Sequence, residues 1–398
     1  MKKTHKHPIK TNTKTRKNKI IKDILVLKST TPREIVKVSN EISADLEQDK
    51  AQGIKASYAP TINDELVSLK SATREKLEDC NNTLAFQMKE PLKIAVPGSF
   101  FGNTCMPYDS TKAQRFLLRN LSANKHIDPS KIITPVQHQS NCWFNTMFVT
   151  LFISDKGRKF FHYFRQLMIQ GKQSDGSAIP KNLKDPFSLL NFAIECSLTG
   201  NKYAYEMDTN TIIKQIYDSI PDKYHKKMPY VVDVNKASNP IRYYNSIINY
   251  LNNNSIQTLF IGNILDNNWK SRIKTEIKKT GKKHAPHIII LEISDGLAGS
   301  SGKVNNKVEK MEVNGIQYVL DSCVVRDVRR QHFCATIVCE GHPMGYDGMS
   351  FRRLVPMKWR DILNSTRRWT FEGTRNPDGT LLEWSFLHGY QMLIYYRV

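Results

Sequence analysis

The 398-residue sequence predicts an α+β fold in which a buried helix packs against a mostly antiparallel sheet. After Pro135, a polar loop changes into an apolar run that starts at Trp143. Apolar side chains then recur at intervals of three and four residues, the spacing of one buried helix face: Met147, Phe148, Leu151 and Phe152. From residue 287 onward, strand-like runs alternate with turns over 287–293, 311–326, 332–339, 367–372 and 388–397.

The composition is typical of a globular protein, with 40% hydrophobic and 10% aromatic residues. No long uncharged apolar run is present, so we expect no transmembrane helix and no membrane partner. Because no apolar segment follows the charged N-terminus, we expect no secretory signal and an intracellular location, cytoplasmic or nuclear. The seven scattered cysteines fit free thiols better than a disulfide framework.

Residues 1–22 are basic and almost free of apolar side chains, so we expect a disordered tail. The tail is interpreted either as a nuclear address or nucleic-acid arm, or as a solubilising extension. The formal net charge of +22 predicts salt-sensitive, non-specific adhesion to nucleic acid.

Residues 23–128 are predicted to form a helical N-terminal extension. Thr31-Pro32-Arg33-Glu34 has the pattern of a capping box with proline at the first helical position. A second amphipathic run carries Leu66, Leu69 and Leu77. Further on, residues 186–198 and 211–219 are predicted as helical, within a region of about 185–255 whose loops are rich in Asn and Tyr. Residues 270–283 form a basic, partly helical run.

Cys142 stands where the buried helix begins. A thiol there meets unpaired backbone N–H groups and the positive end of the helix dipole, which together favour the thiolate. Gln137, five residues upstream, has an amide that can point at an oxyanion developing beside the sulfur. The alternative is that Cys142 is a small buried hydrophobic residue.

A histidine and a carboxylate follow far downstream, at His332 and Asp347, and this is the chain order of papain-like thiol proteases. Asp327 and Asp361 are alternative partners for the histidine. His138 lies closer to Cys142 in sequence and is interpreted at most as a residue lining the substrate site.

Short segments between residues 130 and 398 resemble the sequence boxes of ubiquitin-specific proteases, in the same order. Cys142-Trp-Phe-Asn145-Thr and its helix are similar to the cysteine box, in which an Asn stands five residues before the nucleophile. His332-Phe333-Cys-Ala-Thr-Ile resembles the family's His-Tyr-x-Ala-Tyr box, and Tyr346-Asp347 resembles its Phe-Asp-Asp box. The runs at 286–293 and 389–397 are similar to a core strand and to the closing strand.

The resemblance implies a papain-like cysteine peptidase core in residues 129–398, with a helical thumb packed on an antiparallel-sheet palm. It implies a deubiquitinase-like hydrolase that cleaves ubiquitin or a ubiquitin-like modifier through Cys142, His332 and Asp347, with Gln137 at the oxyanion. The paired Cys-x-x-Cys motifs of the family's zinc-binding fingers are missing from the sequence, so we expect no fingers subdomain, metal or cofactor.

Two other uses of the cysteines are considered. Gly102-Asn103-Thr104-Cys105 reads like the family's nucleophile loop, but Pro107 and polar residues follow, so no buried helix is expected to start at Cys105. A metal site could combine the thiols and imidazole of Cys323, Cys334, Cys339 and His342. In a single strand Cys334 and Cys339 point to opposite faces, which argues against such a site.

Three departures from the family bear on the substrate. Residues 139–141 replace the usual Gly-Asn-Thr, Gln331 stands where the family has a glycine, and Arg326, Arg329 and Arg330 precede the histidine. Because the C-terminal tail of ubiquitin also carries arginines, like charges there would weaken its binding. The alternatives are therefore a cysteine peptidase with a non-ubiquitin substrate, a catalytically inactive protein that binds ubiquitin or a structural partner, and a basic nucleic-acid-associated protein.

Overall fold

The computed structural model describes residues 24–27, 92–97, 103–123, 126–138, 140–201, 204, 207–253, 255–279, 285–294, 304–329, 332–376 and 378–398. The basic tail 1–22 and the helices expected between residues 31 and 77 lie outside these ranges. So do Gln139, Arg330 and Gln331.

The described residues between 111 and 250 are mostly helical, and those after residue 250 are mostly strand. The α-helices are α4 (Thr111–Ala123), α5 (Cys142–Phe152), α6 (Asp155–Phe160), α7 (His162–Gln170), α8 (Lys184–Thr199), α9 (Thr209–Ser219), α10 (Asp222–His225), α11 (Pro240–Tyr250) and α12 (Trp269–Lys279). Short 3-10 turns are η3 (Pro129–Lys131), η4 (Lys181–Leu183) and η7 (Trp359–Ile362). The strands are β1 (Ile24–Leu27), β2 (Lys93–Pro97), β3 (Asn103–Pro107), β4 (Thr258–Ile264), β5 (Ile288–Ile293), β6 (Lys310–Val313), β7 (Ile316–Arg326), β8 (Phe333–Cys339), β9 (His342–Tyr346), β10 (Leu354–Pro356), β11 (Arg368–Phe371), β12 (Trp384–Ser385) and β13 (Gln391–Arg397).

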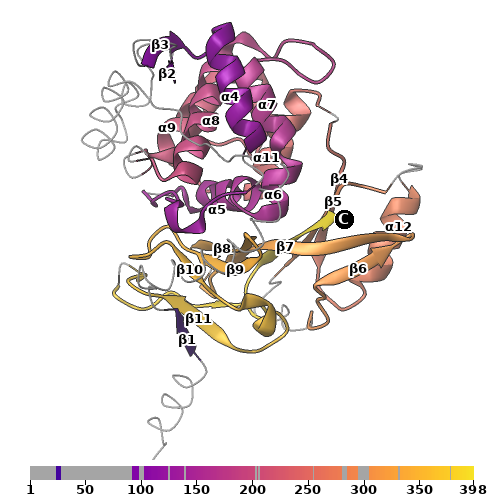
Figure 1. The fold of residues 1–398 in the computed structure, drawn as a ribbon. Coiled ribbons are helices and arrows are strands. Elements are labelled where there is room, and N and C mark those ends of the chain that lie inside the picture. The colour runs from indigo at the N-terminus through magenta and orange to yellow at the C-terminus, as the bar shows by residue number, and fades with distance from the viewer. Residues whose placement is uncertain are drawn as a thin grey trace, which may run out of the picture.

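The helices and the main sheet form two halves, and α5 lies where they meet (Figure 1). The main sheet has the order β10-β9-β8-β7-β13-β5-β4, with β6 also paired to β7. All of its pairs are antiparallel except the parallel pair β4 and β5. Two smaller sheets join β1 to β11 and β12, and β2 to β3. This mixed α+β architecture confirms the predicted fold class at that level.

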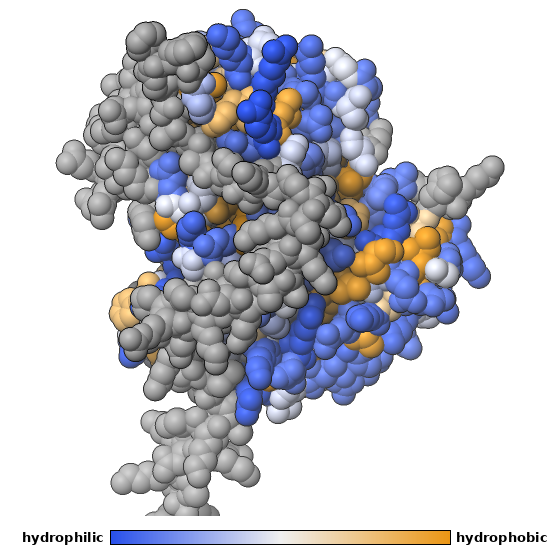
Figure 2. Space-filling model, in the orientation of Figure 1, coloured by the Kyte–Doolittle hydropathy of each residue, from blue (hydrophilic) through white to orange (hydrophobic). Residues whose placement is uncertain are grey.

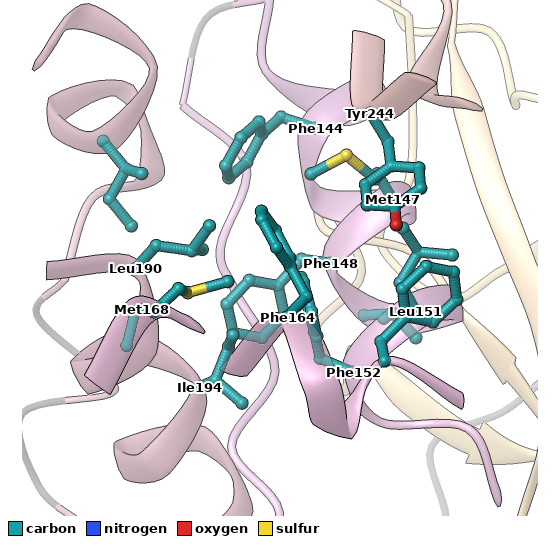
Figure 3. Close-up of a cluster of buried hydrophobic side chains, with 14 of the residues drawn as sticks. Phe144, Met147, Phe148, Leu151, Phe152, Phe164, Met168, Leu190, Ile194 and Tyr244 are labelled. Carbon is teal, nitrogen blue, oxygen red and sulfur yellow. The ribbon is translucent and has the colours of Figure 1, made fainter. Parts of the chain in front are cut away.

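Helix α5 is buried along its whole length, from Cys142 to Phe152. One side of it packs against helices α7, α8 and α11 through a cluster of large apolar side chains (Figure 3). Residues of this cluster include Phe144, Phe148 and Phe152 of α5, Phe164 and Met168 of α7, and Leu190 and Ile194 of α8. Its other side meets the sheet at β7 and β8. A helix apolar on all sides is stable only when it is enclosed in this way.

Two tight turns set the register of the strands β6 to β9. Asn314-Gly315 joins β6 to β7, and Glu340-Gly341 joins β8 to β9. All four residues have positive φ angles, between 46° and 78°, as two-residue hairpin turns require. Asp155 at the start of α6 accepts hydrogen bonds from the N–H groups of Glu340 (2.7 Å) and Gly341 (2.8 Å), so the second turn is also anchored to the helical half.

The five predicted strand regions are confirmed by β5, β6–β7, β8, β11 and β13, apart from the turn inside 311–326. The described part of the N-terminal extension differs from the helical prediction, because residues 93–107 form the hairpin β2–β3. Helix α4 follows, and its Leu117 and Leu121 belong to the same core cluster as α5. This part of the extension is therefore continuous with the core of the helical half.

Much of the described surface on the face in Figure 2 is hydrophilic, and apolar side chains gather on the sheet half around β6 and β7. Among the described residues, no helix is long and apolar enough to span a bilayer.

Candidate active site

Cys142 is the first residue of α5 and is 7% exposed. The preceding residue, Asn141, makes no side-chain cap to the helix. The first N–H groups of α5 therefore remain available at the end where the helix dipole is positive. Both features favour negative charge on an oxygen that is bound beside the sulfur.

His332 lies next to this helix start, immediately before β8. Its Nε2 is 2.6 Å from Oδ1 of Asp347, and both side chains are buried. The other ring nitrogen, Nδ1, is buried without a hydrogen-bond partner among the described residues. The thiol of Cys142 lies close enough to act electrostatically on the ring. The nitrogen available to the sulfur is therefore Nδ1.

The protonated imidazole is stabilised by its neighbours. Burial disfavours the charged ring, but the Asp347 carboxylate and, to a smaller extent, Cys142 outweigh it and raise the pKa of His332 to about 10. At neutral pH the ring therefore carries a proton and a positive charge.

Asp347 is held in turn by groups on two segments. Thr374 donates its hydroxyl to Oδ2, and the N–H of Met349 donates to Oδ1 at 3.1 Å. Because Asp347 is fully buried, these bonds and the His332 bond satisfy a carboxylate that solvent cannot reach. The sequence analysis did not identify Thr374, which lies 27 residues beyond its partner.

Asp327 and Asp361 do not take the place of Asp347. The carboxylate of Asp327 accepts the backbone N–H groups of His332 (2.6 Å) and Arg329 (2.9 Å). It therefore fixes the loop that carries the histidine. Asp361 is exposed in the turn η7.

The indole of Trp384 meets the His332 ring edge-on, with ring centroids 5.8 Å apart. Trp384 is fully buried in β12 and also contacts the ring of Phe371. A large apolar side chain here excludes water from one side of the imidazole and restricts its rotation. No sequence box pointed to this residue.

Gln137 is half-buried on the loop before α5, and its backbone N–H donates to the carbonyl of Gly348 at 3.0 Å. Gly348 directly follows Asp347, so the loop expected to hold the oxyanion is attached to the turn that holds the histidine's partner. A Cβ at Gly348 would lie 3.1 Å from both the N and the Cβ of Gln137. Only glycine allows this close approach without displacement of the loop.

The same loop is also fixed to the helical half by a buried network around Thr209. The hydroxyl of Thr209 accepts from Asn141 Nδ2 (2.9 Å) and donates to Asn145 Oδ1 (2.6 Å). Asn145 Nδ2 in turn donates to the carbonyl of Val136 at 3.0 Å. Asn141 also accepts the N–H of His138 at 3.0 Å. The backbone on both sides of Gln137 is thus held by side chains of α5 and α9.

A second acidic residue, Asp208, lies beside this loop and was not identified from the sequence. Its Oδ1 caps α9 by accepting the N–H of Asn210 at 2.8 Å, and its buried Oδ2 has no partner among the described residues. Burial raises the pKa of Asp208 to about 6, an effect that the Asn210 bonds and the charge of His138 oppose. His138 itself is exposed, and its carbonyl accepts Asn210 Nδ2 at 3.1 Å.

Other cysteines were also considered from the sequence. Cys105 lies within β3, so no helix begins there, as predicted. Cys334 and Cys339 belong to the two different core clusters on opposite faces of β8, also as predicted. Within the described ranges, no group of three or more His, Cys, Asp or Glu side chains could hold a metal ion.

The structure thus brings Cys142, His332, Asp347 and Gln137 to one place, at the junction of α5 with the β8–β9 edge of the sheet. A nucleophile at a helix start, an imidazole and a carboxylate in this order are the parts of an acyl-transfer site. Their catalytic roles remain predictions.

No model of a known protein family matches the chain, and no curated protein matches it. Among solved structures, the SAGA DUB module of Ubp8, Sgf11, Sus1 and Sgf73 bound to monoubiquitin is similar at 10% identity and a TM-score of 0.38, over 84% of this chain and 96% of that chain. The same module bound to ubiquitin aldehyde is similar at 10% identity and a TM-score of 0.38, over 67% of this chain and 70% of that chain. An essential yeast splicing factor is similar at 11% identity and a TM-score of 0.27, over 77% of this chain and 83% of that chain. Scores and identities this low carry no functional argument, so the site must be interpreted from its own geometry.

Proposed function

We propose that the protein is a thiol-dependent hydrolase that cleaves ubiquitin or a ubiquitin-like modifier from other proteins through a thioester intermediate. The observation that carries the proposal is the 2.6 Å contact between His332 and Asp347 beside Cys142 at the start of α5. Such a substrate would place the protein in the cytoplasm or the nucleus.

In the proposed reaction, the sulfur of Cys142 attacks the carbonyl carbon of the scissile bond. The imidazolium of His332 transfers its proton to the leaving amine, and the C–N bond breaks to leave a thioester. A water molecule then gives a proton to His332 and attacks the thioester, which releases the acid and the thiolate. Asp347 holds the imidazole by Nε2 throughout, so that Nδ1 faces the sulfur.

The negative oxygen formed during each attack needs donors in fixed positions. The N–H of Cys142 and the side-chain amide of Gln137 are the proposed donors. Because the Gln137 backbone is tied to Gly348 and to the Thr209 network, the donor is positioned before the substrate arrives.

The electrostatics of the surrounding loops are compatible with a substrate tail that carries arginines. Arg329 donates to Thr380 Oγ1 at 2.9 Å and lies 3.5 Å from the Asp378 carboxylate, so part of its charge is neutralised. Arg326 lies over the Phe333 ring, 5.7 Å from its centroid.

The decisive experiment is reaction with ubiquitin that carries a C-terminal propargyl amide. We expect a covalent adduct of one ubiquitin per chain, mapped to Cys142 by mass spectrometry, and hydrolysis of a fluorogenic ubiquitin C-terminal amide. Both should be lost in Cys142→Ala, whereas Cys196→Ala, which removes a buried thiol of α8, should retain them. Failure to form the adduct while iodoacetamide still labels Cys142 would exclude ubiquitin as the substrate.

The Arg326 position favours a second candidate, a cysteine peptidase whose protein substrate has an acidic segment at the cleavage site. Arg326 is the last residue of β7 and pairs with Phe333, the residue after His332, so its guanidinium would attract such a segment. Cleavage of acidic, but not basic, members of a fluorogenic peptide library by the wild type and not by Cys142→Ala would support this substrate class.

A further inference from the structure

Two large apolar side chains are exposed on the turn that directly follows Asp347. Phe351 is 75% exposed and Met349 is 39% exposed, and both lie between β9 and β10. Isolated exposed apolar residues are ordinary in soluble proteins. These two are unusual because they share one short turn, and because that turn is part of the candidate active site.

The turn is held in one conformation by hydrogen bonds along its length. The N–H of Met349 donates to Asp347 Oδ1 at 3.1 Å, and Ser350 Oγ donates to the carbonyl of Arg352 at 2.8 Å. The N–H of Asp347 donates to the carbonyl of Arg353 at 2.9 Å, so both ends of the turn are fixed.

The backbone of Phe351 is also fixed, although its side chain is exposed. Its N–H donates to the carbonyl of Glu372 at 3.2 Å, and the ring rests on Gly373, where an added Cβ would lie 2.8 Å from it. Gly373 has a φ of +84°, a conformation that other residues rarely adopt. Aromatic side chains have few rotatable bonds, and exposed ones on an ordered backbone are frequent anchors of protein interfaces.

The turn that carries Met349 and Phe351, and the Gly373 segment under the Phe351 ring, are both connected to the proposed catalytic groups. Gly348, one residue before Met349, accepts the N–H of Gln137, and Thr374, one residue after Gly373, donates to Asp347. A protein that covers Phe351 would therefore contact a turn whose neighbouring residues are hydrogen-bonded to Gln137 and Asp347. Two side chains offer far less area than the roughly 800 Å² per partner of a stable interface, so the patch fits one part of a larger substrate contact better than a dimer interface.

We infer that Met349 and Phe351 form a docking site for an exposed apolar side chain on the folded body of the protein substrate. The inference rests on the proposed function. It adds that the enzyme recognises a folded protein and not only the extended segment at Cys142. The patch acts on substrate binding, because neither side chain contacts the reacting atoms.

The test compares two fluorogenic substrates with the same cleavage sequence, full-length ubiquitin amide and the amide of its C-terminal tail alone. In Phe351→Ala we expect kcat/KM for the full-length substrate to fall about tenfold, mainly through KM, and the value for the tail peptide to change less than about twofold. Because the contact is apolar, the loss should persist in about 0.5 M NaCl, where exposed charge interactions are screened. Leu265→Ala removes a 45% exposed side chain next to β4, at the opposite end of the main sheet order from β10, and should leave both substrates unaffected.

Equal losses on both substrates, or no loss on either, would overturn the docking site while leaving the hydrolase intact. A wild-type enzyme that cleaves the tail peptide as efficiently as full-length ubiquitin would also overturn it. Failure of the wild type to cleave either substrate would instead refute the proposed function. Thermal unfolding of Phe351→Ala should match the wild type, because an exposed ring contributes little to the core.

Discussion

His332 and Asp347 are 15 residues apart, yet Nε2 of one lies 2.6 Å from Oδ1 of the other. The hairpin β8–β9 produces this contact, because it pairs Ala335 with Tyr346 and so brings the start of one strand beside the end of the next. The turn Glu340-Gly341 fixes that register, and a shift by one residue would reverse the faces of all side chains in β9. The geometry of the proposed catalytic pair therefore depends on a turn at the far end of the hairpin.

Replacing Asp347 by Asn removes the charge that stabilises the protonated imidazole. We expect kcat/KM to fall at least about 100-fold, since the imidazole loses the partner that orients it. The wild-type kcat/KM should decline with a pKa near 10 as His332 loses its proton, and this alkaline limb should move to lower pH in Asp347→Asn. A pH–rate profile of both proteins with the fluorogenic substrate measures the shift.

The stability of the two proteins gives an independent control. The pKa of His332 is raised above the unfolded value of about 6.5, so its stabilising contribution is complete below that pH and is lost as pH rises toward 10. The difference in unfolding free energy between the wild type and Asp347→Asn should therefore shrink between pH 7 and 10. An alkaline limb at the same pH in both proteins would contradict the assigned pairing.

Gln137→Ala tests the proposed oxyanion donor separately from the nucleophile. We expect kcat to fall by roughly 100-fold or more, the usual effect of removing one such donor, with KM nearly unchanged. The rate of Cys142 alkylation by iodoacetamide should stay the same, because the proposed role of Gln137 is to bind the oxyanion and not to activate the sulfur. If alkylation and turnover fall together, Gln137 acts on the structure of the nucleophile and the oxyanion role is refuted.

Thr209→Val keeps the shape of the side chain and removes the hydroxyl that joins Asn141 to Asn145. Both amides would be left with an unpaired buried group, and we expect a loss of about 1–3 kcal/mol in unfolding free energy together with a lower kcat. Thr211→Val is the matched control, because the hydroxyl of Thr211 is buried on the same helix and has no partner among the described residues. It should be neutral or slightly stabilising. Equal effects of the two variants in urea unfolding would contradict the role of the network.

The parts of the site that local sequence could predict are those whose signal lies within one element. Cys142 was predicted from the change of a polar loop into an apolar helix, and α5 begins at that residue. His332 and Asp347 were identified from the chain order of papain-like thiol proteases and from short boxes that resemble those of ubiquitin-specific proteases, and the strands β8 and β9 place them together. Periodicity predicted the buried helix and the strands, because it depends only on which face of the element is buried.

The residues that sequence reasoning missed act through contacts between distant segments. Thr209 lies 64 residues from Asn145, and Thr374 lies 27 residues from Asp347. Each is a single hydroxyl in an otherwise ordinary segment, so no local pattern marks it. Helix α11 was missed for a different reason, because its many Asn and Tyr residues resemble a loop. Asn239 nevertheless caps it by accepting the N–H of Arg242 at 3.0 Å, with Pro240 at the first position.

The last prediction concerns Asp321, a buried carboxyl group on β7 whose pKa is raised to about 7 by burial and by the nearby Asp155. In the unfolded chain the same group has a pKa near 3.9, so between about pH 4 and 7 the native state binds the extra proton. Its stabilising contribution is therefore complete below pH 4 and is lost as pH rises through 7. Asn cannot lose a proton and can still accept the N–H of Lys156, the bond of 3.2 Å that Asp321 makes. Asp321→Asn should become more stable than the wild type by roughly 2–4 kcal/mol at pH 8, with a much smaller difference at pH 5.

Urea unfolding at the two pH values measures this difference directly. Asp175→Asn serves as the control, because Asp175 is exposed and hydrogen bonds from Ser177 lower its pKa, the opposite direction. That variant should gain nothing over the wild type at pH 8. A stability difference for Asp321→Asn that does not grow between pH 5 and 8 would mean that the carboxyl group is already ionised in the native protein. In that case Arg158, whose charge opposes the shift, must dominate the burial effect.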